Sequence, residues 1–278
     1  MIGQHPELMA LPELKLFAYE TLGEMAASLP RYWIERGMRH RSPGLVRAVG
    51  QFEFGGQGCE HLAAAREWLE ARAHWSGAGM LDWLLERISP RAGVEKSPEN
   101  VETDESLKRL AGAYPRARYV HLVRHPVSTQ RSMAEHAART VPGFTLPDQP
   151  MAGFAYWLET HCRIICFGDT LPAGRYLRLR AEDVLRDARA QMGAVAEWLG
   201  IRADDEAVEA MMHPEDSPFA FPGPEGSGIL SGNDPGFLSD PALRAVDAAP
   251  ALERPPGWVE NDALWQRAAS LAQRMGYR

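Results

Sequence analysis

An arginine at the end of a strand-like segment is the side chain in this sequence best suited to bind an anion. Arg124 is followed by His125 and Pro126, and Ser132 lies farther along the next segment. A guanidinium is a planar fork whose N–H groups fit a phosphate, and the N-terminus of a helix adds backbone donors and a favourable dipole. The Ser132 hydroxyl could donate to the same anion. A purely structural role for Arg124 is the alternative.

The segments around Arg124 have the pattern of a strand followed by a helix. Residues 119–123 are mostly β-forming and carry apolar side chains on both faces, which is typical of a strand with helices on both sides of a parallel sheet. Residues 127–138 follow as a predicted helix. Ligands of open parallel sheets bind outside the carboxyl ends of the strands, so we expect Arg124 to lie at a ligand-binding edge.

A helical first half is followed by alternating strands and helices. Periodicity and turn residues predict strands over 94–96 and 176–179, and helices over 12–29, 62–69, 80–88, 152–167, 181–199 and 262–275. The Pro- and Gly-rich residues 214–235 are expected to form a long loop. This order predicts an α/β fold with a parallel sheet flanked by helices. A single domain over residues 1–278, with a helix-rich region at about 31–90, is the simplest account.

The composition is that of an ordinary globular protein, with 45% hydrophobic and 24% charged residues. The formal net charge of -7 argues against a nucleic-acid partner or a polybasic membrane anchor, although a local group of basic side chains can still bind an anion. No stretch approaches the ~20 apolar residues of a membrane span, and the first residues do not resemble a signal peptide. A cytoplasmic location is therefore expected.

The sequence contains no group of residues with the spacing of a metal site, so we expect no metal. Cys59, Cys162 and Cys166 do not form a paired framework of the kind found in small secreted domains. Cys162 and Cys166 share a face of a predicted helix, where packing is a more common role than metal binding or redox chemistry.

Several segments resemble, in the same order, those of sulfotransferases that use 3′-phosphoadenosine 5′-phosphosulfate (PAPS). Residues 114–126 together with Ser132 resemble the 3′-phosphate-binding segment of that family. Further resemblances are to its Lys-Ser/Thr-Pro element at 95–100, its Arg-Tyr-Glu-Asp-Leu element at 180–184, elements of bacterial members at 233–235 and 276–277, and the segment after its phosphate loop at 3–8 and 12–14. The resemblance covers nearly the whole chain and implies a P-loop-like α/β fold.

The resemblance also implies roles for individual side chains. Arg124 and Ser132 would hold the 3′-phosphate, and Lys96 would lie near the sulfonate and the bridging oxygen, where a cation stabilises charge on the leaving phosphate. Glu13 occupies the place of an acidic base beside the acceptor hydroxyl. The alternatives are a solvated Lys96 after a strand and a Glu13 that only complements a helix dipole.

Other side chains are weaker candidates in the same site. Lys15 could shape the acceptor pocket. The histidines His5, His121 and His125 could act as bases, although packing or hydrogen bonding is the more common role for each. Tryptophans in the helix-rich region suggest an apolar or aromatic acceptor, unless they simply fill the core; they are Trp33, Trp68, Trp75 and Trp83.

The function that the resemblance implies is transfer of a sulfuryl group from PAPS to a hydroxyl of a small-molecule acceptor, with no metal. Transfer of this kind depends on alignment and on cations around the transferred group. Two rival hypotheses are a catalytically silent protein that binds a ligand or partner, and an enzyme that uses the acceptor pocket for other chemistry without PAPS.

The sequence departs from the family pattern in two places. It has no segment like the family's Pro-Arg-Ser-Gly-Thr-Thr loop, whose backbone N–H groups and basic residue hold the 5′-phosphosulfate, and its first lysine or arginine is Lys15. Either the start has been placed too late in the gene, which we slightly favour, or donor binding has been remodelled. The second departure is Ala181, where the family usually has a tyrosine.

Overall fold

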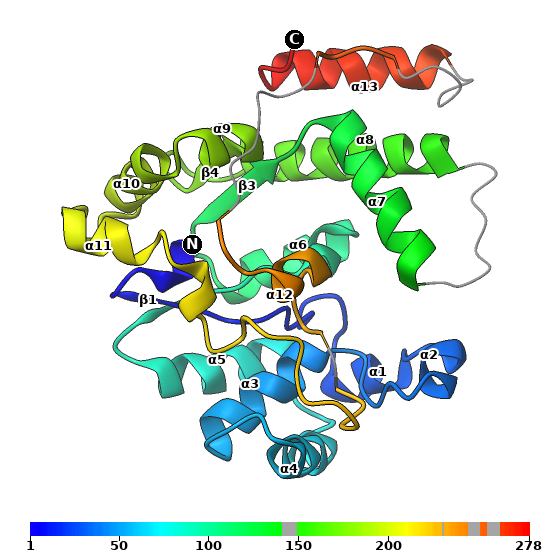
Figure 1. Cartoon of the computed structure of the whole chain (residues 1–278), viewed down its shortest axis with the longest axis vertical. Coiled ribbons are helices and arrows are strands. Elements are labelled where there is room, and N and C mark those ends of the chain that lie inside the picture. The colour runs from blue at the N-terminus through cyan, green and yellow to red at the C-terminus, as the bar shows by residue number, and fades with distance from the viewer. Residues whose placement is uncertain (141–148, 230, 244–250, 255–261) are drawn as a thin grey trace. The chain divides into compact units, whose positions relative to one another are not determined.

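The computed structural model describes residues 1–140, 149–229, 231–243, 251–254 and 262–278 (Figure 1). The chain divides into two compact units. Unit 1 comprises Met1–Pro115 and Arg189–Leu243, and unit 2 comprises Arg116–Ala188 and Arg244–Arg278. Each is described by itself. The expectation of a single domain stays a prediction.

Unit 1 contains a two-stranded parallel sheet and most of the helices. Strand β1 (Leu8–Ala10) pairs with β2 (Ala92–Val94), with Leu8 opposite Ala92. The helices are α1 (Leu22–Ala27), α2 (Arg31–Glu35), α3 (Pro43–Glu53), α4 (Cys59–Glu70), α5 (Gly77–Ile88), α6 (Asp104–Ala113), α10 (Ala188–Leu199, which begins at the boundary), α11 (Asp205–Ala210) and α12 (Pro235–Ser239).

Helix α3 lies at the centre of unit 1. Its N-terminus is capped by Ser42, whose hydroxyl accepts a hydrogen bond from the N–H of Leu45 at 3.2 Å. Most of the helix is buried, and α4 and α5 pack against it. The core around it consists largely of aliphatic side chains, including Leu14, Leu45, Leu62, Met80 and Leu84. Burial of this helix fixes the position of the loops that precede and follow it.

Unit 2 is built on a second two-stranded parallel sheet. Strand β3 (Tyr119–Val123) pairs with β4 (Tyr176–Arg180), with Val123 opposite Arg180. The helices are α7 (Pro126–Thr140), α8 (Gln149–Asp169), α9 (Ala181–Arg186) and α13 (Asp262–Arg274). Helix α8 packs on β3, and α13 lies along α8, as Figure 1 shows. A small core joins β3, α8 and α13, with members that include Val123, Trp157 and Leu271.

The predicted α/β fold with parallel strands flanked by helices is confirmed, and strand 119–123 has the predicted bounds. The described strands form two separate pairs. The strand expected at 94–96 lies slightly earlier, at Ala92–Val94. The helix expected at 181–199 is interrupted at Asp187, which separates α9 from α10. One face of β3 is also open, because Val120 and Leu122 are exposed.

The prediction of a helix over 12–29 is wrong for its first half. Only Leu22–Ala27 is helical, and Lys15 has a positive φ of 58°. A left-handed conformation is costly for a lysine, so surrounding contacts must hold it. The backbone N–H groups of Leu14, Lys15 and Phe17 donate to side chains more than 80 residues away in the sequence. The apolar spacing that suggested a helix serves burial of Leu14, Leu16 and Phe17 in the core.

None of the helices within the described residues is long and apolar enough to cross a membrane.

Candidate functional site

Glu13 and Lys96 form an ion pair in unit 1. Glu13 lies in the irregular segment before α1, and Lys96 follows the end of β2. The Glu13 side chain is 15% exposed, whereas that of Lys96 is 64% exposed. The pair therefore joins a carboxylate held against the protein to an ammonium group that reaches into solvent. Both predicted catalytic side chains thus lie together.

The backbone around Glu13 is held from several directions. Its N–H donates to the carbonyl of Gly232 at 2.8 Å, and its carbonyl accepts from the Ser42 hydroxyl at 3.0 Å. Two residues later, the N–H of Lys15 donates to the hydroxyl of Ser97 at 2.8 Å. These contacts come from the loop at 214–235, from the cap of α3 and from the segment after β2. They place the carboxylate without a regular element of its own.

Glu95 is a site residue for which the sequence suggested no role. Its carboxylate accepts from the N–H of Leu14 at 3.2 Å, from the amide of Asn100 at 2.9 Å and from the Ser97 hydroxyl. Burial raises the pKa of Glu95 to about 7, against the opposing effects of these donors and of Lys96. The only signal in the sequence was its position directly before Lys96.

Lys15 forms a separate, more buried ion pair. Its ammonium lies 2.5 Å from Glu99, and the two side chains are 14% and 13% exposed. The left-handed backbone at Lys15 directs the side chain toward Glu99 while the backbone N–H contacts Ser97. A lysine paired in this way stabilises the bend, and its suggested role in an acceptor pocket stays a prediction.

Arg124 follows β3 directly in unit 2. Its carbonyl accepts a hydrogen bond from the indole N–H of Trp157 at 3.0 Å, which fixes the backbone at the end of the strand. The side chain is exposed, and its guanidinium has no partner among the described residues. Helix α7 begins two residues later at Pro126 and carries Ser132, which is half-buried. Arg124 thus follows a strand and precedes a helix N-terminus, which is the order of elements that the sequence predicted.

The carboxylate of Glu182 connects three segments of unit 2. It accepts from the N–H of His125 at 2.8 Å and from the hydroxyl of Tyr277 at 2.8 Å. Arg180 forms a two-pronged pair with Asp183 at 2.5 and 2.8 Å and donates to the carbonyl of Gly276. The elements at 124–126, 180–184 and 276–277 therefore meet around the end of β3. Ala181, the departure noted above, is the first residue of α9.

The candidate histidines differ in their surroundings. His5 is buried, with Nε2 at 2.8 Å from the carbonyl of Arg202 and Nδ1 accepting from the N–H of Glu7. His121 lies between the hydroxyl of Tyr176 at 2.5 Å and the ring of His161 at 2.7 Å. These contacts match the hydrogen-bonding alternative.

His125 has no hydrogen-bond partner for either ring nitrogen among the described residues. Its ring is fully buried and packs edge-on against Tyr277 at 5.2 Å. Burial lowers the pKa of His125, which keeps the ring neutral. A packing role accounts for a ring in this environment.

Trp75 and Trp83 both pack against Trp68, with ring centroids 5.6 Å and 4.6 Å from that of Trp68. Two arginines lie over these rings: Arg72 is 3.7 Å from Trp68, and Arg87 is 3.5 Å from Trp83. The three indoles therefore form a cluster at the edge of the unit 1 core.

The described residues contain no group of His, Cys, Asp or Glu side chains that could hold a metal ion. The expectation of no metal stays a prediction.

Comparison with known families shows to which family a chain with these residues belongs. The profile of the sulfotransferase family matches residues 1–205, which is most of the chain and includes Glu13, Lys96, Arg124 and Ser132. The chain belongs to the sulfotransferase family. No curated protein matches it in sequence.

Two solved sulfotransferase domains share the fold of this sulfotransferase. One is the sulfotransferase domain from the curacin biosynthetic pathway, with a TM-score of 0.76 and 20% identity; the match covers 100% of this chain and 91% of that one. The other is the sulfotransferase domain from the Synechococcus PCC 7002 olefin synthase, with a TM-score of 0.71 and 24% identity, covering 100% and 88%. At these identities the likeness concerns the fold.

Proposed function

We propose that this sulfotransferase transfers the sulfuryl group of PAPS to a hydroxyl of a small-molecule acceptor, without a metal. The observation that carries the proposal is the guanidinium of Arg124, which lies at the end of a parallel strand and has no partner among the described residues, in a chain of the sulfotransferase family. A guanidinium in this position can bind an anionic group of a ligand. No nucleic-acid or membrane partner is part of the proposal, and a cytoplasmic location accompanies it.

The surroundings of Arg124 fit the 3′-phosphate of the donor. An exposed guanidinium can donate two parallel hydrogen bonds to a phosphate. Ser132 adds a hydroxyl on the same strand-to-helix segment. The network around Glu182 holds the backbone of His125, so the direction in which Arg124 leaves the strand is set before ligand binds. These residues would bind the phosphate and orient the nucleotide.

Glu13 and Lys96 would perform the chemistry at the sulfonate end. In the proposed reaction the acceptor oxygen forms a bond to sulfur while the bond from sulfur to the bridging oxygen breaks. The Glu13 carboxylate takes the proton of the acceptor hydroxyl. The Lys96 ammonium stabilises the negative charge that develops on the leaving phosphate oxygen. The ion pair between them places the Glu13 carboxylate beside the Lys96 ammonium.

Calorimetric titration with 3′-phosphoadenosine 5′-phosphate tests the nucleotide site directly. We expect binding to the wild-type protein and, because Arg124 contacts only the 3′-phosphate, a loss of about tenfold or more in Arg124→Ala. Affinity for adenosine 5′-phosphate should change much less. Arg116→Ala removes another exposed arginine of unit 2 and serves as the matched control.

Two results would count against the proposal. Absence of nucleotide binding by the wild-type protein would exclude PAPS as donor, and equal weakening of both nucleotides would show that Arg124 does not contact the 3′-phosphate. Nucleotide binding without sulfuryl transfer to any alcohol or phenol would instead favour the rival hypothesis of a ligand-binding protein.

A further inference from the structure

A pocket lies between helices α8 and α13 of unit 2, apart from the residues discussed above. Its volume is about 580 Å³, within the range of small-molecule sites. The pocket is lined by Leu158 and Cys162 of α8 and by Gln266, Arg267, Ser270 and Arg274 of α13. The strand-end residues Arg124 and Ser132 are not among them. The pocket therefore forms a separate place at which a ligand could bind.

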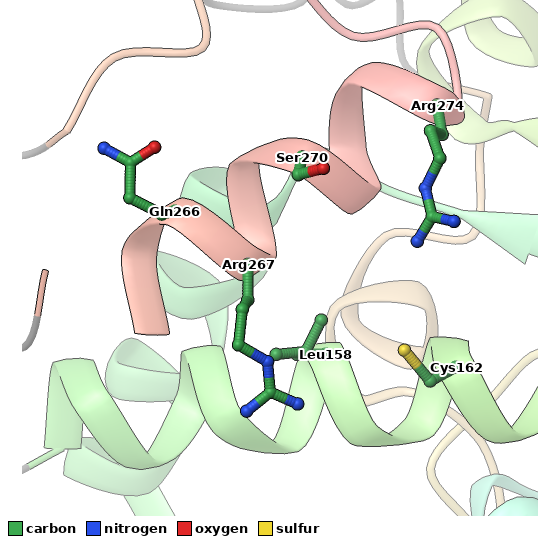
Figure 2. A pocket seen from close by; sticks show the side chains of 6 residues that line it. All are labelled: Leu158, Cys162, Gln266, Arg267, Ser270 and Arg274. Carbon is green, nitrogen blue, oxygen red and sulfur yellow. The ribbon is translucent and has the colours of Figure 1, made fainter. Parts of the chain in front are cut away.

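The two arginines give this pocket its charge. Arg267 and Arg274 are exposed, and neither guanidinium has a partner among the described residues. They stand seven residues apart in the sequence, which places them about two helical turns, or ~10.5 Å, apart along one side of α13. Figure 2 shows both side chains directed from α13 toward α8. No acidic side chain is among the described residues that line the pocket.

The rest of the lining adds neutral donors and an apolar floor. Ser270 lies between the two arginines on the same helix, as Figure 2 shows. Leu158 and the thiol of Cys162 face them from α8. The α8 side chains also belong to or pack against the core of unit 2, so the floor is held in place. A few converging polar groups above an apolar surface are typical of a small-ligand site.

We propose that the pocket between α8 and α13 binds a small molecule that carries two phosphate groups. Each guanidinium offers a planar pair of N–H donors that fits one phosphate. Two such forks, two turns apart on one helix, match two anionic groups better than one. The apolar floor at Leu158 would contact the part of the molecule that joins them.

The thiol of Cys162 provides a local reporter for this site. The chain has three cysteines, so the Cys59→Ser/Cys166→Ser variant retains only Cys162. The rate at which iodoacetamide, a neutral reagent, alkylates Cys162 can be followed by mass spectrometry. We expect millimolar hexane-1,6-diol bisphosphate, whose apolar chain separates two phosphates, to slow this reaction several-fold. Inorganic phosphate should be at least about tenfold less effective because it engages one fork only.

Substitutions in this background distinguish a site from general charge effects. Arg267→Ala and Arg274→Ala should each weaken protection by the bisphosphate about tenfold or more, whereas Arg116→Ala, with the same change in net charge, should leave it unaltered. Arg124→Ala should also retain protection, which separates this pocket from the proposed nucleotide site.

Three outcomes would overturn the proposal. They are alkylation that the bisphosphate does not slow, protection that survives both α13 substitutions, and equal protection by phosphate and the bisphosphate. Loss of protection in Arg116→Ala to the same extent would likewise show that the protein only attracts anions in general.

Discussion

The partners of each charged side chain separate the residues that stabilise the fold from those that remain available to a ligand. Lys15 is paired with Glu99, with both side chains largely buried, and Arg180 is paired with Asp183. Arg124, by contrast, has no partner among the described residues. The charges of these side chains are therefore neutralised within the protein. A free guanidinium at a strand end keeps its donors for another molecule.

Replacement of the proposed base should abolish most of the turnover while leaving nucleotide binding intact. We expect Glu13→Gln to lower kcat by about 100-fold or more, since general bases contribute at least that much. Its affinity for 3′-phosphoadenosine 5′-phosphate should stay near that of the wild type. The assay is sulfuryl transfer to any hydroxyl compound that the wild-type protein accepts. Glu20→Gln, an exposed carboxylate of the same segment, is the control. A Glu13→Gln protein with an undiminished rate would remove Glu13 from the mechanism.

At the scale of elements, the candidate base depends on close backbone packing rather than on a helix or strand. Gly44, near the N-terminus of α3, leaves no room for a side chain: a Cβ there would lie 2.3 Å from the carbonyl oxygen of Glu13 and 3.0 Å from its backbone nitrogen. Gly232, which has a positive φ of 96°, is also close to Gly44: a Cβ on Gly232 would lie 2.7 Å from the Cα of Gly44. Three segments that are distant in the sequence therefore meet at Glu13.

Gly44→Ala should displace the Glu13 segment. We expect a loss of roughly 1–3 kcal/mol in the free energy of unfolding, which is the usual cost of overpacking, together with reduced sulfuryl transfer. The measurement is urea denaturation followed by the transfer assay. Gly112→Ala is the matched control: nothing lies within 4 Å of its Cβ, and it stands within α6, where alanine is favoured by about 0.5–1 kcal/mol. Equal stability of the two variants would contradict the packing described for Gly44.

At the scale of the whole molecule, stability should depend on pH through the His121 and His161 pair in unit 2. Burial lowers the pKa of His121 to about 3, helped by His161 and Arg178, and burial lowers that of His161 to about 4. The ordinary value is 6.5. Between about pH 4 and 6.5 the unfolded chain therefore binds more protons than the folded chain does, and the free energy of unfolding falls as the pH falls.

The free energy of unfolding should change with pH by as much as about 1.4 kcal/mol per pH unit for each histidine. In His121→Gln/His161→Gln this slope should be smaller, whatever the absolute stability of the variant. Urea denaturation at several values between pH 4 and 7 measures it, with the exposed His74→Gln as control. An unchanged slope in the double variant would show that these rings do not govern the acid sensitivity.

The local sequence pattern was sufficient to predict the elements around Arg124 and the family of the protein. Strand 119–123, Arg124 and the following helix were predictable because alternating β-formers, a helix-favouring proline and a recognisable run of residues lie side by side in the chain. The order of the motifs likewise indicated the sulfotransferase family, which the family profile confirmed.

Only the tertiary structure decided the conformation of segments whose hydrogen-bond partners are distant in the sequence. The segment around Glu13 has the apolar spacing of a helix, yet its N–H groups bond to Glu95, Ser97 and Gly232. Those partners offer hydrogen bonds and burial that a local helix would forgo, so the chain bends at Lys15 instead. The hydrogen bonds of Glu95 and Glu182 could not be predicted for the same reason. The role of a carboxylate depends on the donors that folding brings to it, and the spacing of residues along the chain does not encode those donors.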